Sequence, residues 1–363
     1  MFLNMKKMTL NVVLVLLALS LVTFSVPFVE AQSWTTRTAM PTARGQASVI
    51  LAPNGLIYVI GGYNVSYDVV TTVEAYDPNT DTWTTKASLL SATRGASATV
   101  GIDGLIYVFG GYNTSSVYAT QIYDPLLDAW SYGADMPIAQ WGAGAAAALN
   151  GKIYVIGGED DPNATLIYDP VADSWSSGAQ MPTERLEHVV VLGPDALIYA
   201  IGGMNYSDVL MLDVDAYNPD TDTWMTRAPL PSGRCWMGVT TGLSTSYVIG
   251  GGNGTEYIDV NEEATSLDPT KIYVFGGGTD YSNNAPPVYG DTYVYDPTTD
   301  AWSTGTAMPK ARREQGAITL PITGFPVGGE ILSTNTLLLL APYLLLIGIV
   351  IGTGMILYKK QLV

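Results

Sequence analysis

Short apolar runs separated by clusters of glycine, proline, asparagine and aspartate make up most of the chain. In the plainest case, four apolar residues precede a diglycine, as in LIYVIGG at 56–62, LIYVFGG at 105–111, KIYVIGG at 152–158 and LIYAIGG at 197–203. Runs this short, rich in β-branched and aromatic residues and bounded by turn-forming residues, are typical of antiparallel strands. Outside the two hydrophobic ends no segment predicts a helix, so we expect an all-β fold.

The predicted strands repeat with a regular period. Trp34, Trp83, Trp130, Trp175 and Trp224 lie 49, 47, 45 and 49 residues apart. Within a period, a turn ending in arginine is followed by a strand of small residues and by the diglycine strand. A strand ending in Tyr-Asp-Pro, or Tyr-Asn-Pro in one copy, then leads to the strand that begins near the next tryptophan. Four strands in about 50 residues predict one blade of a β-propeller.

These residues resemble the kelch repeat, in which four apolar residues and a diglycine are followed by a tyrosine and a tryptophan at characteristic spacing. The resemblance extends from Trp34 to Leu320 and implies a kelch-type β-propeller, in agreement with the strand count. The glycines permit backbone conformations and close packing that a Cβ atom would obstruct. Tyrosine and tryptophan supply buried area between blades, and aspartate and proline shape the turn.

One region departs from the repeat and affects the number of blades. The 78 residues from Trp224 to Trp302 contain two diglycine strands but lack one tryptophan strand and one arginine-led inner strand. Spare strands lie at the two ends of the repeat region, at 33–40 and at 312–320. We therefore predict six blades with an irregular closure in which the spare strands fill the gaps. Five or seven blades remain compatible with the sequence.

Both ends of the chain are hydrophobic. Residues 1–31 combine two lysines, an apolar run and a small-residue exit, which predicts a secretory signal peptide, with an uncleaved signal anchor as the alternative. Residues 337–358 are long and apolar enough to cross a bilayer as a helix, and the lysines that follow favour the cytoplasmic side. We expect a single-pass protein of the cell membrane, with an extracytoplasmic propeller at 32–320, a linker at 321–336 and a cytoplasmic tail at 359–363.

Composition excludes several classes of partner and chemistry. The formal net charge of −17 at pH 7 argues against nucleic acid, which would be repelled. Cys235 is the single cysteine, so no intrachain disulfide is possible. With His188 as the single histidine, the chain also lacks the ligands for the copper site of propellers resembling galactose oxidase. We expect no metal and no cofactor, because turn formation explains acidic strings such as EDDPNAT and DPNTD more simply than weak calcium binding.

The predicted topology assigns each loop to one of two faces. We call the end of the ring where the inner strands begin the upper face. Antiparallel pairing places both the loop after the diglycine and the loop carrying the arginine on this face. The Tyr-Asp-Pro turns fall on the lower face. Five Asn-x-Ser/Thr sequons all lie in the loop after the diglycine: Asn64, Asn113, Asn163, Asn205 and Asn253. We predict a glycosylated upper rim; the alternative is that asparagine suits the left-handed turn that follows a diglycine.

A second set of polar residues recurs at the start of the inner strands. It consists of Arg44, Arg94, Arg185, Arg234 and Arg312, with Gln140 in place of arginine in the third blade. These side chains are expected to line the upper mouth of the channel and to bind carboxylate or phosphate groups, for which a guanidinium is suited. The alternative is that each arginine pairs with a nearby acid or carbonyl group and joins adjacent blades.

These patterns favour a binding or adhesion module over an enzyme. A surface protein or an acidic glycan is the expected partner, bound at the face away from the membrane, because the chain leaves the last strand at the lower face. The alternative is a metal-independent mutarotase or epimerase resembling the kelch-type sialic acid epimerases. Such an enzyme could use Glu184 or Glu187 with Arg185 for proton transfer, although the spacing does not single out a pair.

Overall fold

The computed structural model describes residues 33–241, 245–249, 259, 261–265, 267–278, 288–313 and 316–320. Within these residues every regular element is a β-strand, and the strands form six four-stranded sheets, which confirms the predicted all-β propeller with six blades. In that same part of the chain no helix is long and apolar enough to cross a membrane. The predicted signal peptide, linker, membrane helix and tail lie outside the described residues.

Each of the first four blades consists of four consecutive strands, ordered from the channel outward. Blade 1 contains β2 (Ser48–Leu51), β3 (Ile57–Ile60), β4 (Val73–Asp77) and β5 (Thr82–Thr85). Blade 2 contains β6 (Ser97–Val100), β7 (Ile106–Phe109), β8 (Thr120–Asp124) and β9 (Ala129–Gly133). Blade 3 contains β10 (Gly144–Ala147), β11 (Ile153–Ile156), β12 (Thr165–Asp169) and β13 (Ser174–Ser177). Blade 4 contains β14 (Val189–Leu192), β15 (Ile198–Ile201), β16 (Val214–Asn218) and β17 (Thr223–Arg227).

The last two blades are interleaved along the chain. Blade 5 contains β18 (Gly238–Thr241), β21 (Ile272–Phe275), β22 (Thr292–Asp296) and β23 (Ala301–Thr304). Between β18 and β21 the chain forms β19 (Thr245–Ile249) and β20 (Asn261–Thr265), which are the middle strands of blade 6. The inner strand of blade 6 is β24 (Gly316–Leu320) and its outer strand is β1 (Ser33–Thr36). The two ends of the propeller therefore meet in one sheet.

The spare strands at the two ends fill the gaps in the repeat, as predicted. In one respect the pairing departs from the order of the sequence, because the inner strand led by Arg234 pairs with the second diglycine strand, with Gly238 opposite Phe275. The hairpin of β19 and β20 has no tryptophan strand of its own. Instead, β24 pairs with its β19 edge and β1 pairs with its β20 edge. The inner strand β18 therefore pairs with β21, in the blade that ends with the Trp302 strand β23.

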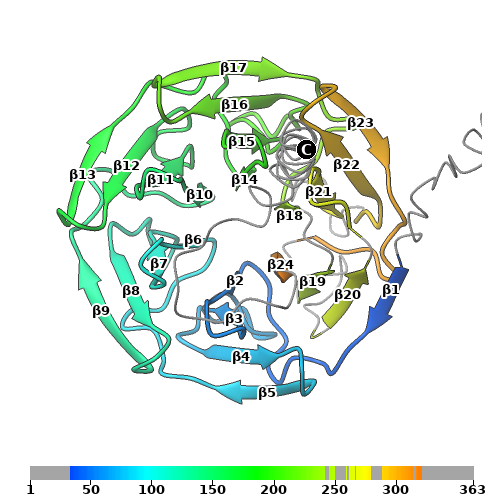
Figure 1. Ribbon diagram of the computed structural model, residues 1–363. Coiled ribbons are helices and arrows are strands. Elements are labelled where there is room, and N and C mark those ends of the chain that lie inside the picture. Colours follow the sequence, from blue (N-terminus) through cyan, green and yellow to red (C-terminus); the bar gives the residue numbers. More distant parts are fainter. Residues whose placement is uncertain are drawn as a thin grey trace, which may run out of the picture. The chain divides into compact units, whose positions relative to one another are not determined.

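The six inner strands are arranged around the centre of the ring (Figure 1). Around the ring they follow the order β2, β6, β10, β14, β18 and β24, and β24 lies beside β2 again. A cavity of about 460 Å³ lies between them and is lined mainly by alanine, valine, serine and threonine. The strands that carry the tryptophans form the outer edge of the ring (Figure 1).

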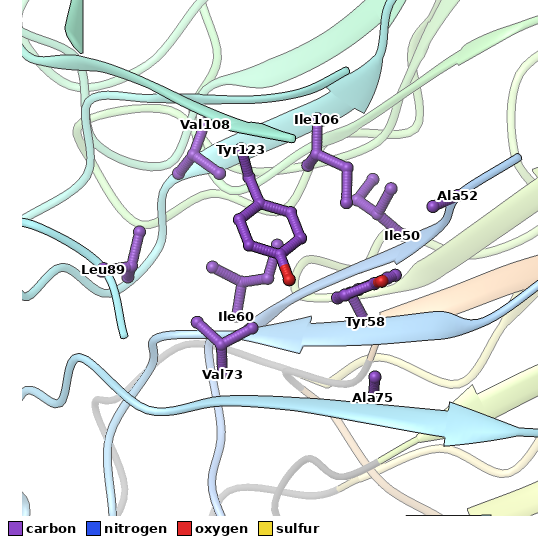
Figure 2. Packing of buried hydrophobic residues seen from close by; sticks show 10 residues of the cluster. All are labelled: Ile50, Ala52, Tyr58, Ile60, Val73, Ala75, Leu89, Ile106, Val108 and Tyr123. Atoms are coloured by element: carbon purple, nitrogen blue, oxygen red, sulfur yellow. The ribbon is translucent and has the colours of Figure 1, made fainter. Parts of the chain in front are cut away.

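Apolar side chains fill the space between neighbouring blades. Between blades 1 and 2, Tyr58 and Ile60 face Val108 and Tyr123, and all four are buried (Figure 2). The rings of the two tyrosines meet edge to face, with centroids 5.4 Å apart. Full burial of one large apolar side chain contributes roughly 1.5–3 kcal/mol, so these clusters are the main source of stability in a chain with one cysteine.

Each of the first five blades is also clamped to its neighbour by one aspartate and one tryptophan. In blade 2, Asp128 accepts a hydrogen bond from the Ala87 backbone N–H of blade 1 at 2.8 Å, and Trp130 Nε1 donates to the carbonyl of the same alanine at 2.9 Å. The aspartate also accepts from the hydroxyl of Tyr123 in its own blade at 2.6 Å. Blades 1, 3, 4 and 5 repeat the arrangement with Asp81, Asp173, Asp222 and Asp300.

The diglycine allows two blades to approach closely, as predicted. Gly61 and Gly62 have φ angles of 63° and 94°, in the left-handed region that favours glycine. A Cβ atom on Gly61 would lie 2.5 Å from the carbonyl oxygen of Thr93 in blade 2. The N–H of Gly62 donates to that same oxygen at 2.9 Å, so the second glycine supplies a hydrogen bond between the blades.

Candidate functional site

The loop after the diglycine and the segment that leads into the inner strand lie together at the upper face. In blades 1, 2, 4 and 5 they pair directly, through the bridges Gly45–Tyr63, Arg94–Tyr112, Leu186–Met204 and Cys235–Gly278. The two loop types are therefore on one face, as the predicted topology requires. Residues of these segments form the upper mouth of the channel.

Most of the predicted arginine ring lies inside the blades and not at this mouth. The side chains of Arg44, Arg185, Arg234 and Arg312 have no exposed surface, which corrects the expectation that they line it. Arg44 bonds to Glu74 on β4 at 2.9 Å and to the carbonyls of Val59 and Thr72. Burial lowers the pKa of Arg44 to about 10, and Glu74 partly offsets this, so the guanidinium stays charged at neutral pH.

The other three buried arginines make equivalent contacts within their own blades. Arg185 pairs with Asp215 on β16, and Arg312 pairs with Glu262 on β20. Arg234 lies over the ring of Tyr293 on β22, with its Cζ 4.3 Å from the centroid, and donates to the Gly276 carbonyl at 2.9 Å. Each arginine therefore joins the start of the inner strand to the third strand of the same blade. This agrees with the predicted alternative, in which the arginines pair with nearby acids or carbonyls, except that the contacts lie within one blade and not between blades.

Blade 2 departs from this pattern by one residue, and the departure brings Arg94 to the mouth. The interblade hydrogen bond from the second glycine ends on the carbonyls of Arg185, Arg234 and Arg312, and in blade 3 on that of Gln140. In blade 2 it ends on Thr93. Thr93 thus occupies the buried position, where its hydroxyl donates to the Gly110 carbonyl at 2.9 Å, and Arg94 occupies the next position, towards the channel.

A sequence signal for this shift exists, but alignment on the arginine hides it. The buried position lies four residues after a Met or Leu that is itself buried: Met40, Leu89, Met136, Met181, Leu230 and Met308. Counting four residues from Leu89 gives Thr93 and not Arg94. The residue on the third strand supports the same shift. Where blades 1 and 4 have an acid that pairs with Arg44 or Arg185, blade 2 has Gln121, which binds the backbone of Ser91 instead.

Backbone hydrogen bonds link the blades at the mouth. The N–H groups of Gly95, Gly142, Glu187 and Trp236 donate in turn to the carbonyls of Gln46, Gly95, Gly142 and Glu187, at 2.8–3.2 Å. All five residues have positive φ angles between 51° and 67°. Three of them are not glycine, and non-glycine residues with such angles are uncommon and costly. This row of bonds fixes the residues beside it, including Arg94, in position.

Arg94 is the half-buried arginine at this mouth, and three aromatic rings enclose it. Its Cζ lies 4.4 Å from the ring centre of Tyr63, 4.6 Å from that of Tyr112 and 5.0 Å from that of Trp141. Its Nη1 donates to the side-chain oxygen of Gln46 at 2.7 Å. Among the described residues no carboxylate lies within ion-pair distance of it. The rings hold the planar guanidinium in place, so its remaining N–H groups can bind an anion.

An acidic residue, Glu159, lies close to this cluster, and its N–H donates to the Trp141 carbonyl at 2.9 Å. Glu159 follows the diglycine of blade 3, at the position that tyrosine occupies in blades 1 and 2. Burial and the nearby Asp160 raise the pKa of Glu159, and the positive charge of Arg94 partly offsets this. Glu159 and Asp160 therefore carry negative charge near Arg94.

Comparison with known proteins agrees with the repeat. The model of the Kelch motif matches residues 48–90, 93–137, 143–182, 189–231 and 266–309, more than half of the chain. The chain belongs to the kelch-repeat family. No curated protein matches it. A solved structure described as "Structure of YjhT" is similar to this kelch propeller with a TM-score of 0.61 and 15% identity, covering 78% of this chain and 89% of that one, which shows a shared fold.

The candidate catalytic residues do not assemble into the expected pair. In this kelch propeller Arg185 is enclosed and bound to Asp215, so it cannot contact a ligand together with Glu184 or Glu187. Glu184 is exposed and Glu187 is buried beside the mouth. His188 packs between the glycines of blades 3 and 4. Within the described residues no three metal-binding side chains gather.

Four of the five sequon asparagines lie in the upper loops of the kelch blades. Asn64 and Asn205 each accept two backbone hydrogen bonds from residues two and four positions later, which is the turn-forming role expected as the alternative to glycosylation. Asn113 and Asn163 lie in the corresponding loops and are half-buried. Asn253 lies outside the described residues. Glycosylation of these loops remains a prediction.

Proposed function

We propose that this kelch propeller is a membrane-anchored binding module that recognises carboxylate groups at the upper mouth of its channel. The anchor is the predicted helix at 337–358, and the ligand is an acidic glycan or an acidic segment of a surface protein. Kelch propellers commonly serve as binding modules. The observation that carries the proposal is the position of Arg94, held against three aromatic rings with no acid paired to it among the described residues.

The chemistry around Arg94 supports a ligand with a carboxylate. A guanidinium forms two parallel hydrogen bonds to a carboxylate, and fixing its plane in advance reduces the entropy lost on binding. Tyrosine, tryptophan and arginine are the residues enriched at the energetic centres of binding surfaces. Exposed Tyr67 packs against Tyr63, with ring centroids 6.2 Å apart, so a ligand that reaches Arg94 also meets aromatic surface.

The buried arginines do not contribute to this function directly. Arg44, Arg185, Arg234 and Arg312 bind groups of their own blades and have no surface to offer a ligand. Gln140 is likewise buried, and its side-chain nitrogen donates to the Asp161 carbonyl at 3.3 Å. The proposal therefore depends on one cation and its neighbours and not on a ring.

A screen of the full-length protein in detergent tests this function. The protein would be applied to an array of acidic glycans, their neutral counterparts and acidic and neutral peptides. We expect binding to acidic members of one class, loss of that binding in Arg94→Met, and no change in Lys152→Met, which removes a charge at the lower face. Binding to neutral and acidic members alike, or equal binding by Arg94→Met, would contradict the proposal.

The same samples distinguish a binder from an enzyme. A binding module should not accelerate the interconversion of the anomers of an acidic sugar, which NMR follows directly. Acceleration that disappears in Arg94→Met would instead support the mutarotase alternative at the same mouth.

A further inference from the structure

Exposed aliphatic side chains lie on the lower turns of two adjacent blades. Ile102, Leu126 and Leu127 of blade 2 and Leu149 and Val171 of blade 3 are all between 74% and 98% exposed. All five lie at the tips of lower turns, either between the first and second strands or between the third and fourth. Ile102 and Val171 border a common hollow of about 400 Å³. We refer to these five residues as the lower patch.

The lower patch is a departure from the repeat. At the tip of the turn between the third and fourth strands, blades 1, 4 and 5 have Asn79, Asp220 and Thr298, whereas blades 2 and 3 have Leu126 and Val171. At the tip of the turn between the first and second strands, blades 1 and 4 have Pro53 and Pro194, whereas blades 2 and 3 have Ile102 and Leu149. The fold accepts polar residues or proline at these positions, so folding does not require aliphatic ones.

In the turns between the third and fourth strands, the backbone N–H groups at the tips are already hydrogen-bonded within the turn. Asp124 accepts from the N–H groups of Leu126 and Leu127 at 2.8 and 3.2 Å, and Asp169 accepts from that of Val171 at 3.0 Å. An unpaired N–H group is costly to move into an apolar medium. These turns can therefore enter such a medium without exposing unpaired donors at their tips.

The lower patch lies on the face from which the chain leaves the propeller towards the predicted membrane helix. β24 runs antiparallel to β19, and Leu320 pairs with Thr245 at its lower end, so the chain leaves the propeller at the lower face. Blade 6, which contains β24, lies across the ring from blade 3 (Figure 1). The remaining 43 residues include the apolar stretch 337–358. The point at which the chain leaves for the predicted anchor and the lower patch therefore lie on the same face, on opposite sides of the ring.

We propose that the lower patch inserts into the surface of the membrane that holds the anchor. The inference rests on the proposed anchor, and it adds a second attachment point that fixes the tilt of the propeller and turns the upper mouth away from the lipid. Asp103, Asp124 and Asp169 beside the tips would be repelled by anionic headgroups. The expected surface is therefore zwitterionic or neutral lipid, entered to a shallow depth.

A fluorescent probe on two equivalent turn tips tests this insertion. Full-length protein with Val171→Cys, or with Asp220→Cys as the matched control in blade 4, would carry a polarity-sensitive dye and be reconstituted into phosphatidylcholine vesicles. Native Cys235 is fully buried, so the dye attaches to the introduced residue. We expect a blue shift at position 171 and loss of most of its emission when lipids carry a nitroxide near the headgroup, with neither change at position 220.

Each other outcome overturns the inference in a distinguishable way. If the protein floats with the vesicles but the quencher leaves both positions unaffected, the anchor stands and the patch does not contact lipid. If the protein does not float with the vesicles, the anchor fails and the patch inference fails with it. A blue shift at position 171 that lipid quenchers leave unchanged and that dilution of the protein abolishes would assign the patch to a second copy of the chain.

Discussion

At the residue scale, the five arginines of the predicted ring divide into two chemical roles that their shared sequence context conceals. Arg44, Arg185, Arg234 and Arg312 are enclosed and bind their own blades. Arg94, displaced by one position, is exposed to the channel mouth and held by rings. A buried ion pair adds little over an apolar pair of the same shape, but removing one partner leaves an unpaired charge in the interior. The two roles therefore predict opposite effects on stability and binding.

Replacing Arg44 by methionine should lower the free energy of unfolding by about 3–5 kcal/mol, because Glu74 is left buried without its partner. Arg94→Met should cost only about 1 kcal/mol, the value of its contacts with the rings. Urea denaturation of the two variants measures both. The double variant Arg44→Met, Glu74→Leu should recover much of the loss, and comparable costs for Arg44→Met and Arg94→Met would contradict the division.

His188 should make the propeller less stable in mild acid. Burial and the neighbouring Arg185 lower the pKa of His188 from 6.5 to about 3. Its stabilising contribution is complete above pH 6.5 and is lost as the pH falls towards 3, because only the unfolded chain takes up the proton. The loss is about 1.4 kcal/mol per pH unit below 6.5. Urea denaturation between about pH 5 and pH 7.5 should show this slope reduced in His188→Gln; an unchanged slope would contradict it.

At the element scale, the blades are joined by groups that lie at fixed places in every repeat. The aspartate and tryptophan of one blade hold the N–H and C=O of one residue in the preceding blade, and the second glycine holds the next blade at the mouth. The tyrosine and the neighbouring N–H lower the pKa of Asp128, so its carboxylate stays ionised in mild acid. These bonds explain why the glycine, aspartate and tryptophan recur together.

Asp128→Ala should lower the free energy of unfolding by about 1–3 kcal/mol, because the Tyr123 hydroxyl and the Ala87 N–H lose their acceptor. Asp135→Ala, which changes an exposed aspartate of the next segment, is the matched control and should be neutral. Chemical denaturation measures both variants. Equal stability of the two would show that the interblade clamp does not stabilise the ring.

The sequence predicts the elements well because their causes are local. Four apolar residues and a diglycine specify a strand and its end, and Asp-Pro specifies a turn, so the blades and the faces of their loops follow from the order of signals. The register of Arg94 and the pairing of β18 with β21 depend on distant partners. Counting four residues from Leu89 points to Thr93 as the buried residue, but its role is an interblade contact, because its carbonyl accepts from Gly62 of the neighbouring blade.

At the scale of the whole molecule, the ring is closed by strands from both ends of the repeat region. Blade 6 takes β24 from one end and β1 from the other, so β20 and β1 are not joined by the turn that carries the clamping aspartate elsewhere. Trp34 still donates to the Thr306 carbonyl at 3.0 Å and packs against Phe275. The joint between blades 5 and 6 therefore keeps the tryptophan contact, although the outer strand of blade 6 comes from the other end of the repeat region.

Amide hydrogen exchange should reveal this joint. We expect the amides of β19 and β20 to exchange faster than those of β7 and β8, because strands held by chain ends open locally at lower free energy. Trp34→Ala should accelerate exchange in blade 6 and leave blade 2 unchanged. Uniform protection across all six blades would indicate that the closure is as strong as the other joints.

The central claim is that the upper mouth binds a carboxylate through Arg94. The most direct measurement is a calorimetric titration of the full-length protein with a glucuronate oligosaccharide and with its glucose counterpart, repeated with Arg94→Met and Lys152→Met. A charge-assisted hydrogen bond contributes about 1.5–3 kcal/mol, so Arg94→Met should weaken binding of the acid roughly ten- to hundredfold. Lys152→Met should leave binding unchanged, and the neutral sugar should not bind. Equal affinity of wild type and Arg94→Met for the acid, or equal affinity for both sugars, would contradict the account.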